Sequence, residues 1–257
     1  MDGPVLQGQN RWMPDAIFED PRLAAVYDPL DPDRSDLDVY VDLVAELGAA
    51  SVLDVGCGTG TLACMLASRG IHVTAVDPAR ASIDVARRKP GADSVDWLVG
   101  DATTLPALAV DAALMTANVA QVFLTDDAWS ATLRGIKSAL RPGGTLVFET
   151  RDPQRRAWEQ WTPELTHIAV DIAGADVVEA WEEVTAVDGQ LVTFRSMTVF
   201  QRDGLALEST STLRFRERSE IEESLVREGY DVIEVRDAPD RPGHEFVYLC
   251  RRPLLAS

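Results

Sequence analysis

The sequence has few of the residues that build disulfide frameworks and metal sites. Its 257 residues include only three cysteines, Cys57, Cys64 and Cys250, and three histidines. The cysteines form no C-x-x-C pair and no even set, so we expect neither a disulfide scaffold nor a metal ion. Such cysteine usage is typical of a reducing compartment, and we therefore expect a cytoplasmic protein.

Basic residues are also scarce. The 24 lysines and arginines are outnumbered by 42 aspartates and glutamates, which gives a formal net charge of −18. A surface this acidic repels phosphate backbones and anionic membranes. The densest basic groups are short and are not interleaved with aromatic residues, as a nucleic-acid groove would require; they lie at 87–89, 155–156 and 251–252. We therefore expect a small-molecule acceptor as partner, and neither a nucleic acid nor a membrane.

Long hydrophobic runs are missing as well. No stretch approaches the roughly 20 apolar residues that cross a bilayer. The first 15 residues lack a basic region followed by an apolar one, so we expect no signal peptide. With 46% hydrophobic and 26% charged residues, the composition is that of a globular protein with one sizeable core.

The middle of the chain alternates the signals of strands and helices. This alternation predicts an α/β fold with a mainly parallel sheet and helices on both faces. The sequence Arg-Pro-Gly-Gly at 141–144 is expected to end the last helix of this region. The expected strands are 51–55, 71–76, 95–99, 111–116 and 145–149, and the expected helices are 61–69, 81–88 and 126–140.

The pattern changes after residue 150. Three strand-like runs, 177–186, 191–200 and 205–216, are separated by Asp-Gly turns, which predicts a three-stranded antiparallel meander. A helix is then expected from a capping box at Ser219 and Glu222 to Gly229. Two more strands, 231–235 and 246–250, would return to the core sheet.

These patterns divide the chain into four parts. Residues 1–40, rich in Asp and Pro, are expected to form an N-terminal helical lid over residues 41–150, the α/β core. Residues 151–216 would be an inserted antiparallel β cap. Residues 217–257 would supply the helix and two strands that complete the core sheet.

The segment Val-Leu-Asp-Val-Gly-Cys-Gly-Thr-Gly at 52–60 concentrates three glycines behind the first strand. A loop in this position lies at the carboxyl end of the sheet, where ligands bind, and glycines let a ligand approach the main chain. The dinucleotide fingerprint G-x-G-x-x-G would need a third glycine at position 61, which is Thr61. The spacing is therefore wrong for NAD.

The spacing Asp54-x-Gly56-x-Gly58-x-Gly60 instead resembles motif I of the class I S-adenosylmethionine-dependent methyltransferases. Three further segments match this family in order, namely Ala-Val-Asp-Pro at 75–78, Gly-Asp-Ala at 100–102 and Leu-Arg-Pro-Gly-Gly-Thr-Leu at 140–146. The resemblance implies a Rossmann-like seven-stranded sheet, mostly parallel with an antiparallel last strand. It also implies S-adenosylmethionine as methyl donor and S-adenosylhomocysteine as product.

The resemblance assigns roles to the acids that follow these strands. Asp77 would accept hydrogen bonds from two ribose hydroxyls, and Asp101 would hold the adenine together with the next backbone N–H. Asp54 would orient the loop or contact the methionine ammonium through water. Taken singly, Asp77 could instead cap a helix and Asp101 could be a turn residue. The expected cofactor-binding residues are Asp54, Gly56, Gly58, Gly60, Asp77, Pro78, Asp101, Ala102, Asn118 and Tyr27.

Residues on the acceptor side are expected after the fourth and fifth strands and before the last one. The segment 115–121 lacks the Asn/Asp-Pro-Pro-Tyr/Phe motif, which argues against methylation of nucleobase amines. His244 would be a general base at the start of the last strand, or else a solvated loop residue. His72 is discounted because it opens its strand at the far end. The expected catalytic residues are His244 and Asn118, and the expected substrate-binding residues are Arg151, Gln121 and His167.

The sequence thus predicts a monomeric or homodimeric enzyme that methylates an oxygen or nitrogen of a small molecule. Two alternatives remain open at this point. One is a non-catalytic protein that binds S-adenosylmethionine or S-adenosylhomocysteine, and the other is a nucleotide-cofactor oxidoreductase. The β cap would shape the acceptor cavity or form a dimer contact.

Overall fold

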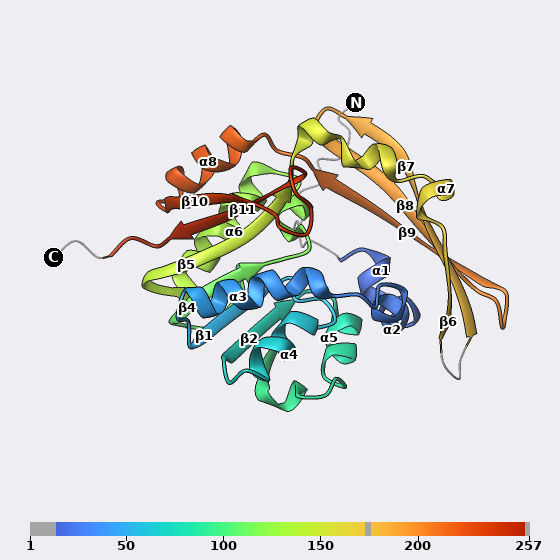
Figure 1. Ribbon diagram of the computed structural model, residues 1–257, viewed down its shortest axis with the longest axis horizontal. Helices are drawn as coiled ribbons and strands as arrows, with labels where there is room; N and C mark the ends of the chain where they lie inside the picture. The colour runs from blue at the N-terminus through green and yellow to red at the C-terminus, as the bar shows by residue number, and fades with distance from the viewer. Residues whose placement is uncertain (1–13, 173–175, 255–257) are drawn as a thin grey trace, which may run out of the picture.

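The computed structural model describes residues 14–172 and 176–254. Its core is a seven-stranded sheet with the order β10-β11-β5-β4-β1-β2-β3 (Figure 1). Only β11 runs antiparallel to its neighbours, which confirms the expected sheet. The strands are β1 (Ser51–Val55), β2 (His72–Asp77), β3 (Val95–Val99), β4 (Val110–Met115), β5 (Leu140–Arg151), β10 (Asp231–Asp237) and β11 (Glu245–Arg251).

Helices cover both faces of this sheet, so its strands are buried on both sides. On one face, Trp129, Leu133 and Ile136 of α6 pack with Ile221 and Leu225 of α8. The other face is covered by α3 and α4. The α-helices of the core are α3 (Asp38–Glu46), α4 (Thr61–Ala67), α5 (Arg80–Ala86), α6 (Asp126–Ala139) and α8 (Arg218–Arg227), with the 3₁₀ turns η1 (Ser35–Leu37), η2 (Ala92–Ser94) and η3 (Val119–Val122).

The insertion forms a second, four-stranded antiparallel sheet with the order β6-β7-β8-β9. The sequence predicts three of these strands and misses β6. That strand has only five residues, lies at the sheet edge and is largely exposed, so it carries no clear hydrophobic alternation. The insert contains η4 (Pro153–Arg155), η5 (Ala157–Gln160), α7 (Pro163–Thr166), β6 (Ile168–Ile172), β7 (Asp176–Asp188), β8 (Leu191–Phe200) and β9 (Leu205–Arg214).

Two expected element ends are wrong. Helix α8 starts at Arg218 with Glu217 as its N-cap residue, two residues before the expected Ser219. The Glu220 carboxylate accepts the backbone N–H of Glu217 at 2.8 Å, so carboxylates make the capping box. Helix α6 ends at Ala139, and the Arg-Pro-Gly-Gly segment belongs to the start of β5 rather than to a turn.

The N-terminal helices α1 (Ala16–Glu19) and α2 (Pro21–Leu30) lie between the core and the insert sheet (Figure 1). Leu23 and Val26 pack against Val178 and Phe200 of the insert. The lid expected over residues 1–40 is therefore helical where it is described, although residues 1–13 lie outside the described residues. The expected boundary at residue 40 falls inside α3.

None of the helices in the described ranges is long and apolar enough to span a bilayer.

The close packing of α6 against the segment at Ala102 can be tested at Gly135. A Cβ atom there would overlap the backbone carbonyl of Ala102. Although Gly→Ala in a helix interior usually stabilises, we expect Gly135→Ala to lower the free energy of unfolding by about 1–3 kcal/mol, because backbone atoms must move apart. Urea denaturation measures this change. The exposed Ser138→Ala in the same helix should change it by less than about 0.5 kcal/mol, and a stabilised Gly135→Ala would contradict the packing.

Candidate cofactor and acceptor site

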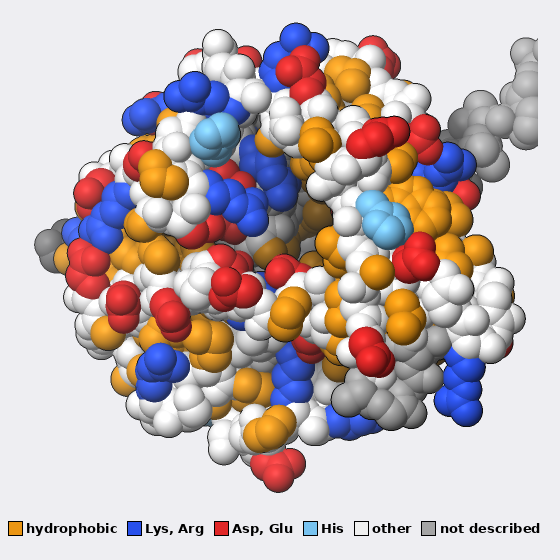
Figure 2. Space-filling view, turned by 45° about the vertical axis from the view of Figure 1, so that its right-hand side comes forward, with side chains coloured by type: hydrophobic (Ala, Val, Ile, Leu, Met, Phe, Trp, Pro, Cys, Tyr) orange, Lys and Arg blue, Asp and Glu red, His pale blue; other side chains and the backbone are white. Residues whose placement is uncertain are grey.

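A cavity of about 290 Å³ lies at the carboxyl edge of the core sheet. The ends of β1, β2 and β4 form one wall, the N-terminal helices another, and the inner face of the insert sheet the third. Figure 2 shows a hollow on this side of the molecule, with basic side chains along one margin and hydrophobic ones along the other. Of the expected residues, those lining the cavity are Tyr27, Asp54, Gly56, Gly58, Asp77, Pro78, Asp101, Ala102, Asn118 and Arg151.

The glycine loop after β1 packs closely against neighbouring side chains. Gly56 has φ +72°, and a Cβ there would lie 2.6 Å from a methyl carbon of Val119. Gly60, with φ +78°, faces the ring of Trp97, which leaves no room for a Cβ. Gly60 therefore supports the loop without lining the cavity. Both the backbone conformation and the space require glycine at these two positions.

Asp77 holds this loop by a hydrogen bond to its backbone at Gly58. Its Oδ2 accepts the N–H of Gly58 at 2.8 Å, and its Oδ1 accepts the N–H of Ala79 at 2.8 Å. Burial raises the pKa of Asp77 to about 6, against the opposing effect of these two N–H groups. Because each carboxylate oxygen has a second lone pair, both oxygens can still accept hydrogen bonds from a diol.

Asp54 and Asp101 lie on either side of Asp77. Asp54 is 1% exposed, and burial, together with the nearby Asp77 charge, raises its pKa to about 7. Its Oδ2 has no hydrogen-bond partner in the described chain. Asp101 accepts the N–H and the hydroxyl of Thr103 on Oδ1, which holds the turn after β3.

The N-terminal helices are bonded to the cofactor side of the cavity. Asp28 accepts a hydrogen bond from the Thr59 hydroxyl and forms an ion pair with Lys89, both at 2.7 Å. Tyr27 lines the cavity with its ring 5.7 Å from that of Phe18, and burial raises the pKa of its phenol. These contacts place aromatic side chains over the cavity.

Beyond the end of β4, Ala117 and Asn118 adopt the left-handed region with φ +53° and +59°. A non-glycine residue in this region is strained, so the surrounding structure must hold it there. The Asn118 backbone N–H donates to Glu149 Oε1 at 3.0 Å, and its side-chain amide lies 3.4 Å from both oxygens of Glu245. Asn118 Oδ1 is buried with no partner among the described residues and belongs to the cavity wall.

The two acids that contact Asn118 are strongly buried. Glu149 is 6% exposed and Glu245 is 3% exposed. Burial, together with the neighbouring Glu245, raises the pKa of Glu149 to about 8. Arg151 and Arg241 offset the charge of Glu245, with N–O distances of 3.6 and 2.8 Å.

Arg151 lines the cavity, whereas Gln121 lies behind it. The Arg151 guanidinium donates to Gln121 Oε1 at 3.0 Å and lies 5.4 Å from the Trp161 ring centroid. Its guanidinium also pairs with Glu245, with an N–O distance of 3.6 Å. Gln121 is 1% exposed, so it positions Arg151 rather than touching the cavity.

The two histidines expected near the acceptor do not line the cavity. His244 is exposed, and its carbonyl accepts the Asp152 N–H at 2.8 Å, in the turn before β11. His167 lies against Glu179 at 3.1 Å, with its side chain 47% exposed. The sequence selected them by residue type, but neither side chain reaches the site.

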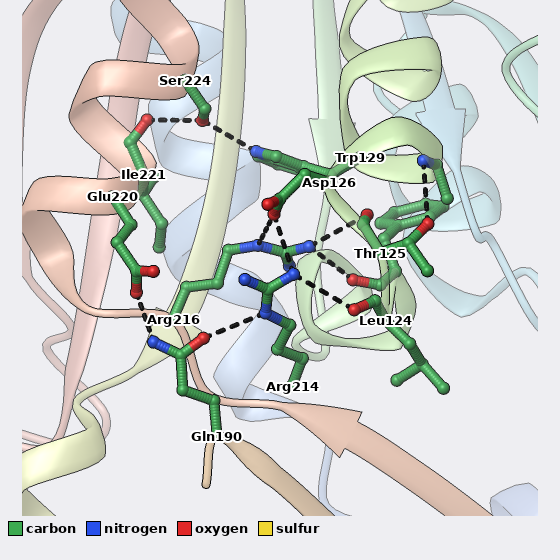
Figure 3. Close-up of polar contacts among 12 residues, drawn as sticks. Leu124, Thr125, Asp126, Trp129, Gln190, Arg214, Arg216, Glu220, Ile221 and Ser224 are labelled. Atoms are coloured by element: carbon green, nitrogen blue, oxygen red, sulfur yellow. Dashed lines mark hydrogen bonds and ion pairs between the residues drawn. The ribbon is translucent and has the colours of Figure 1, made fainter.

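A pair of arginines joins the insert sheet to the loop behind the cavity (Figure 3). Arg216 donates to the carbonyl oxygens of Phe123 and Thr125 at 2.7 and 3.2 Å. Arg214 donates to the carbonyl of Leu124 at 3.1 Å and to Asp126 at 2.8 Å. Because Phe123 lines the cavity, these bonds hold part of its wall.

Comparison with known proteins finds a family that matches the core of this chain. Residues 52–144 match the family described as "Methyltransferase domain". The chain carries a class I S-adenosylmethionine-dependent methyltransferase domain. The match covers the glycine loop and the acids at the ends of β2 and β3.

Two curated relatives align with about half of the chain. A cypemycin N-terminal methyltransferase from Streptomyces is 35% identical over 42% of this chain and 44% of its own length. A ubiquinone biosynthesis O-methyltransferase from Methylocella silvestris is 36% identical over 51% of this chain and 47% of its own length. The chain thus spans less than half the length of these two relatives.

The whole fold, including the insert sheet, has a structural counterpart. CalS10, an amino pentose methyltransferase from Micromonospora echinaspora, superposes with a TM-score of 0.66 over 96% of this chain and all of that one. At 22% sequence identity this likeness concerns the fold.

Several residues in or next to the cavity could not be found from sequence motifs. Glu149 and Glu245 meet Asn118 only through the pairing of β5 with β11. The inward residues of the insert sheet could have been sought through strand alternation, which places every second residue on one face. The lining residues that the sequence did not single out include Phe18, Arg34, Glu182, Phe194, Ser196, Ser211 and Leu213.

Asp77 offers a direct test of the cofactor wall. Asp77→Ala removes the acceptors for the N–H groups of Gly58 and Ala79 and for a ribose diol, so we expect it to weaken S-adenosylhomocysteine binding at least tenfold. Isothermal titration calorimetry measures the dissociation constant. The matched control is Asp96→Ala, an exposed acid on neighbouring β3. Equal affinity of both variants for S-adenosylhomocysteine would remove Asp77 from the binding site.

The raised pKa of Glu149 predicts a pH dependence of stability. Between its ordinary value of 4.5 and about 8, the folded protein keeps a proton that the unfolded chain has lost. This group therefore makes the free energy of unfolding fall as pH rises through that window. Glu149→Gln retains the oxygen that accepts the Asn118 N–H but cannot ionise.

We therefore expect Glu149→Gln to gain stability relative to the wild type from pH 5 to pH 8, with a slope of at most about 1.4 kcal/mol per pH unit. Urea denaturation at several pH values measures the difference. Glu223→Gln, at an exposed position of α8, should show no such slope. Parallel pH profiles for the wild type and Glu149→Gln would contradict the proton assignment.

Proposed function

We propose that this protein transfers a methyl group from S-adenosylmethionine to a nitrogen or oxygen atom of a small-molecule acceptor. The observation that carries the proposal is the single cavity in which the family's cofactor acids and the inner face of the insert sheet form opposite walls. The strongly acidic chain also disfavours nucleic acids as acceptors.

The residues of the core wall fit the cofactor. Asp77 is proposed to bind the ribose, and Asp101 with Ala102 the adenine. The buried oxygen Asp54 Oδ2 has no partner in the described chain, and an ammonium group supplies the donor it lacks. S-adenosylmethionine, when bound, supplies an electrophilic methyl group beside these residues.

The remaining residues would orient the acceptor and exclude water. Tyr27 and Phe18 cover the cavity from the lid side. Asn118 Oδ1 can accept a hydrogen bond from an N–H or O–H of the acceptor and so direct a lone pair of the reacting atom. Arg151, held by Gln121 and Glu245, is proposed to bind the acceptor at the far side. His244 has no part in this arrangement because it lies outside the cavity.

Named relatives act on acceptors of both kinds. One curated relative is an O-methyltransferase of ubiquinone biosynthesis, and structural counterparts include an amino pentose methyltransferase and a sugar N-methyltransferase. These names support a small-molecule acceptor and leave both nitrogen and oxygen open for this chain. A non-catalytic cofactor-binding protein remains the alternative from another functional class.

Two measurements test the proposal together. Calorimetry should show binding of S-adenosylhomocysteine and no binding of NAD. Incubation with methyl-tritiated S-adenosylmethionine and a filtered metabolite extract should place tritium in the small-molecule fraction. Cofactor binding with label in no fraction would favour the non-catalytic alternative, and label only in macromolecules would contradict a small-molecule acceptor.

A further inference from the structure

The inner face of the insert sheet presents a row of polar side chains to the cavity. Glu182 on β7 lies directly across from Ser196 on β8, and Ser196 lies across from Ser209 on β9. Since alternate residues of a strand share a face, Phe194 and Ser211 belong to the same surface. Ser209 accepts the N–H of Ile17 at 2.9 Å, so the lid covers that end of the row.

Glu182 is the acid of this row, and no ion pair to it within 4 Å is found in the described residues. The two arginines in the cavity wall already have acidic partners, since Arg34 pairs with Asp36 at 3.2 Å and Arg151 with Glu245 at 3.6 Å. Burial raises the pKa of the Glu182 carboxyl, and the charge of Arg151 and the neighbouring Ser196 hydroxyl oppose this rise. The cavity therefore contains a partly buried carboxylate without a direct counter-ion.

Ser196, directly across from Glu182, is the second polar group of this surface. Its side chain lines the cavity and is only 7% exposed. Its Oγ is buried and makes no hydrogen bond of good geometry among the residues described, although the Glu182 carboxylate is close by. A buried hydroxyl without a partner is costly unless a ligand supplies one.

We infer that Glu182 and Ser196 form a binding site for a protonated amino group of the acceptor. An ammonium group has three donors and no acceptor, so it can satisfy the carboxylate and the hydroxyl together and neutralise the buried charge. Phe194 and Leu213 on the same wall would contact the apolar part of the molecule. This inference rests on the proposed function and concerns recognition only, whichever atom receives the methyl group.

Three probes of nearly equal shape test the charge preference, namely benzylamine, benzyl alcohol and benzoate. Their binding to the S-adenosylhomocysteine-bound protein at pH 7.5 can be measured by calorimetry or ligand-observed NMR. We expect the wild type to bind benzylamine at least tenfold more tightly than the other two. Glu182→Gln should reduce this preference to less than twofold, and Glu182→Asp should retain part of it.

The matched control is Glu183→Gln. Glu183 is the next residue on β7, faces the opposite side of the sheet and pairs with Arg195, so its loss removes the same charge outside the cavity. This variant should keep the full preference for benzylamine. A wild type without the preference, or a Glu182→Gln variant that keeps it, would overturn the inference. Binding of S-adenosylhomocysteine should be unchanged in all variants, and its absence would instead count against the proposed function.

Discussion

The backbone turn after β1 is the constraint on which the site depends. Val119 and Trp97 occupy the space where side chains at Gly56 and Gly60 would lie, so their packing fixes the position of the loop. Asp77 then ties the Gly58 N–H to the end of β2. Because the ends of neighbouring parallel strands are thereby fixed to each other, the acids that follow them keep constant relative positions. A ligand on this wall meets a surface that is already formed.

The protein buries carboxyl groups near the site where it is expected to bind a cationic cofactor. Asp54, Asp77 and Glu149 all have raised pKa values because burial disfavours their charged forms. Such groups cost stability in the free protein, and a ligand that supplies donors or positive charge offsets part of that cost. The same reasoning applies to Glu182 on the opposite wall. Desolvated acids on both sides thus give the cavity a selectivity for cations that its surface charge alone would not provide.

Sequence reasoning found the core strands and the acids that line the cavity at their carboxyl ends because both follow local rules. Hydrophobic runs marked the strands, and the spacing from Asp54 through Asp77 to Asp101 marked their carboxyl ends. It failed where function depends on contacts between distant segments. Asn118 and Glu245 are 127 positions apart and meet only when β11 inserts beside β5. His167 and His244 have suitable chemistry, but neither is among the residues that line the cavity.

The insert sheet can determine the acceptor without disturbing the cofactor wall. Its inward residues Glu182 and Ser196 alternate with outward residues such as Glu183 and Arg195, while the backbone ladder is the same for either set. Two hydrogen bonds also hold the sheet in place. Ser209 accepts the N–H of Ile17 in the N-terminal helices, and Arg216, just after β9, donates to the carbonyl of Phe123. A substitution on the inward face therefore changes the chemistry presented to the acceptor while the position of the sheet is kept. The choice of acceptor would then depend on the side chains of the insert sheet, whereas cofactor binding would depend on the backbone of the glycine loop and the strand ends.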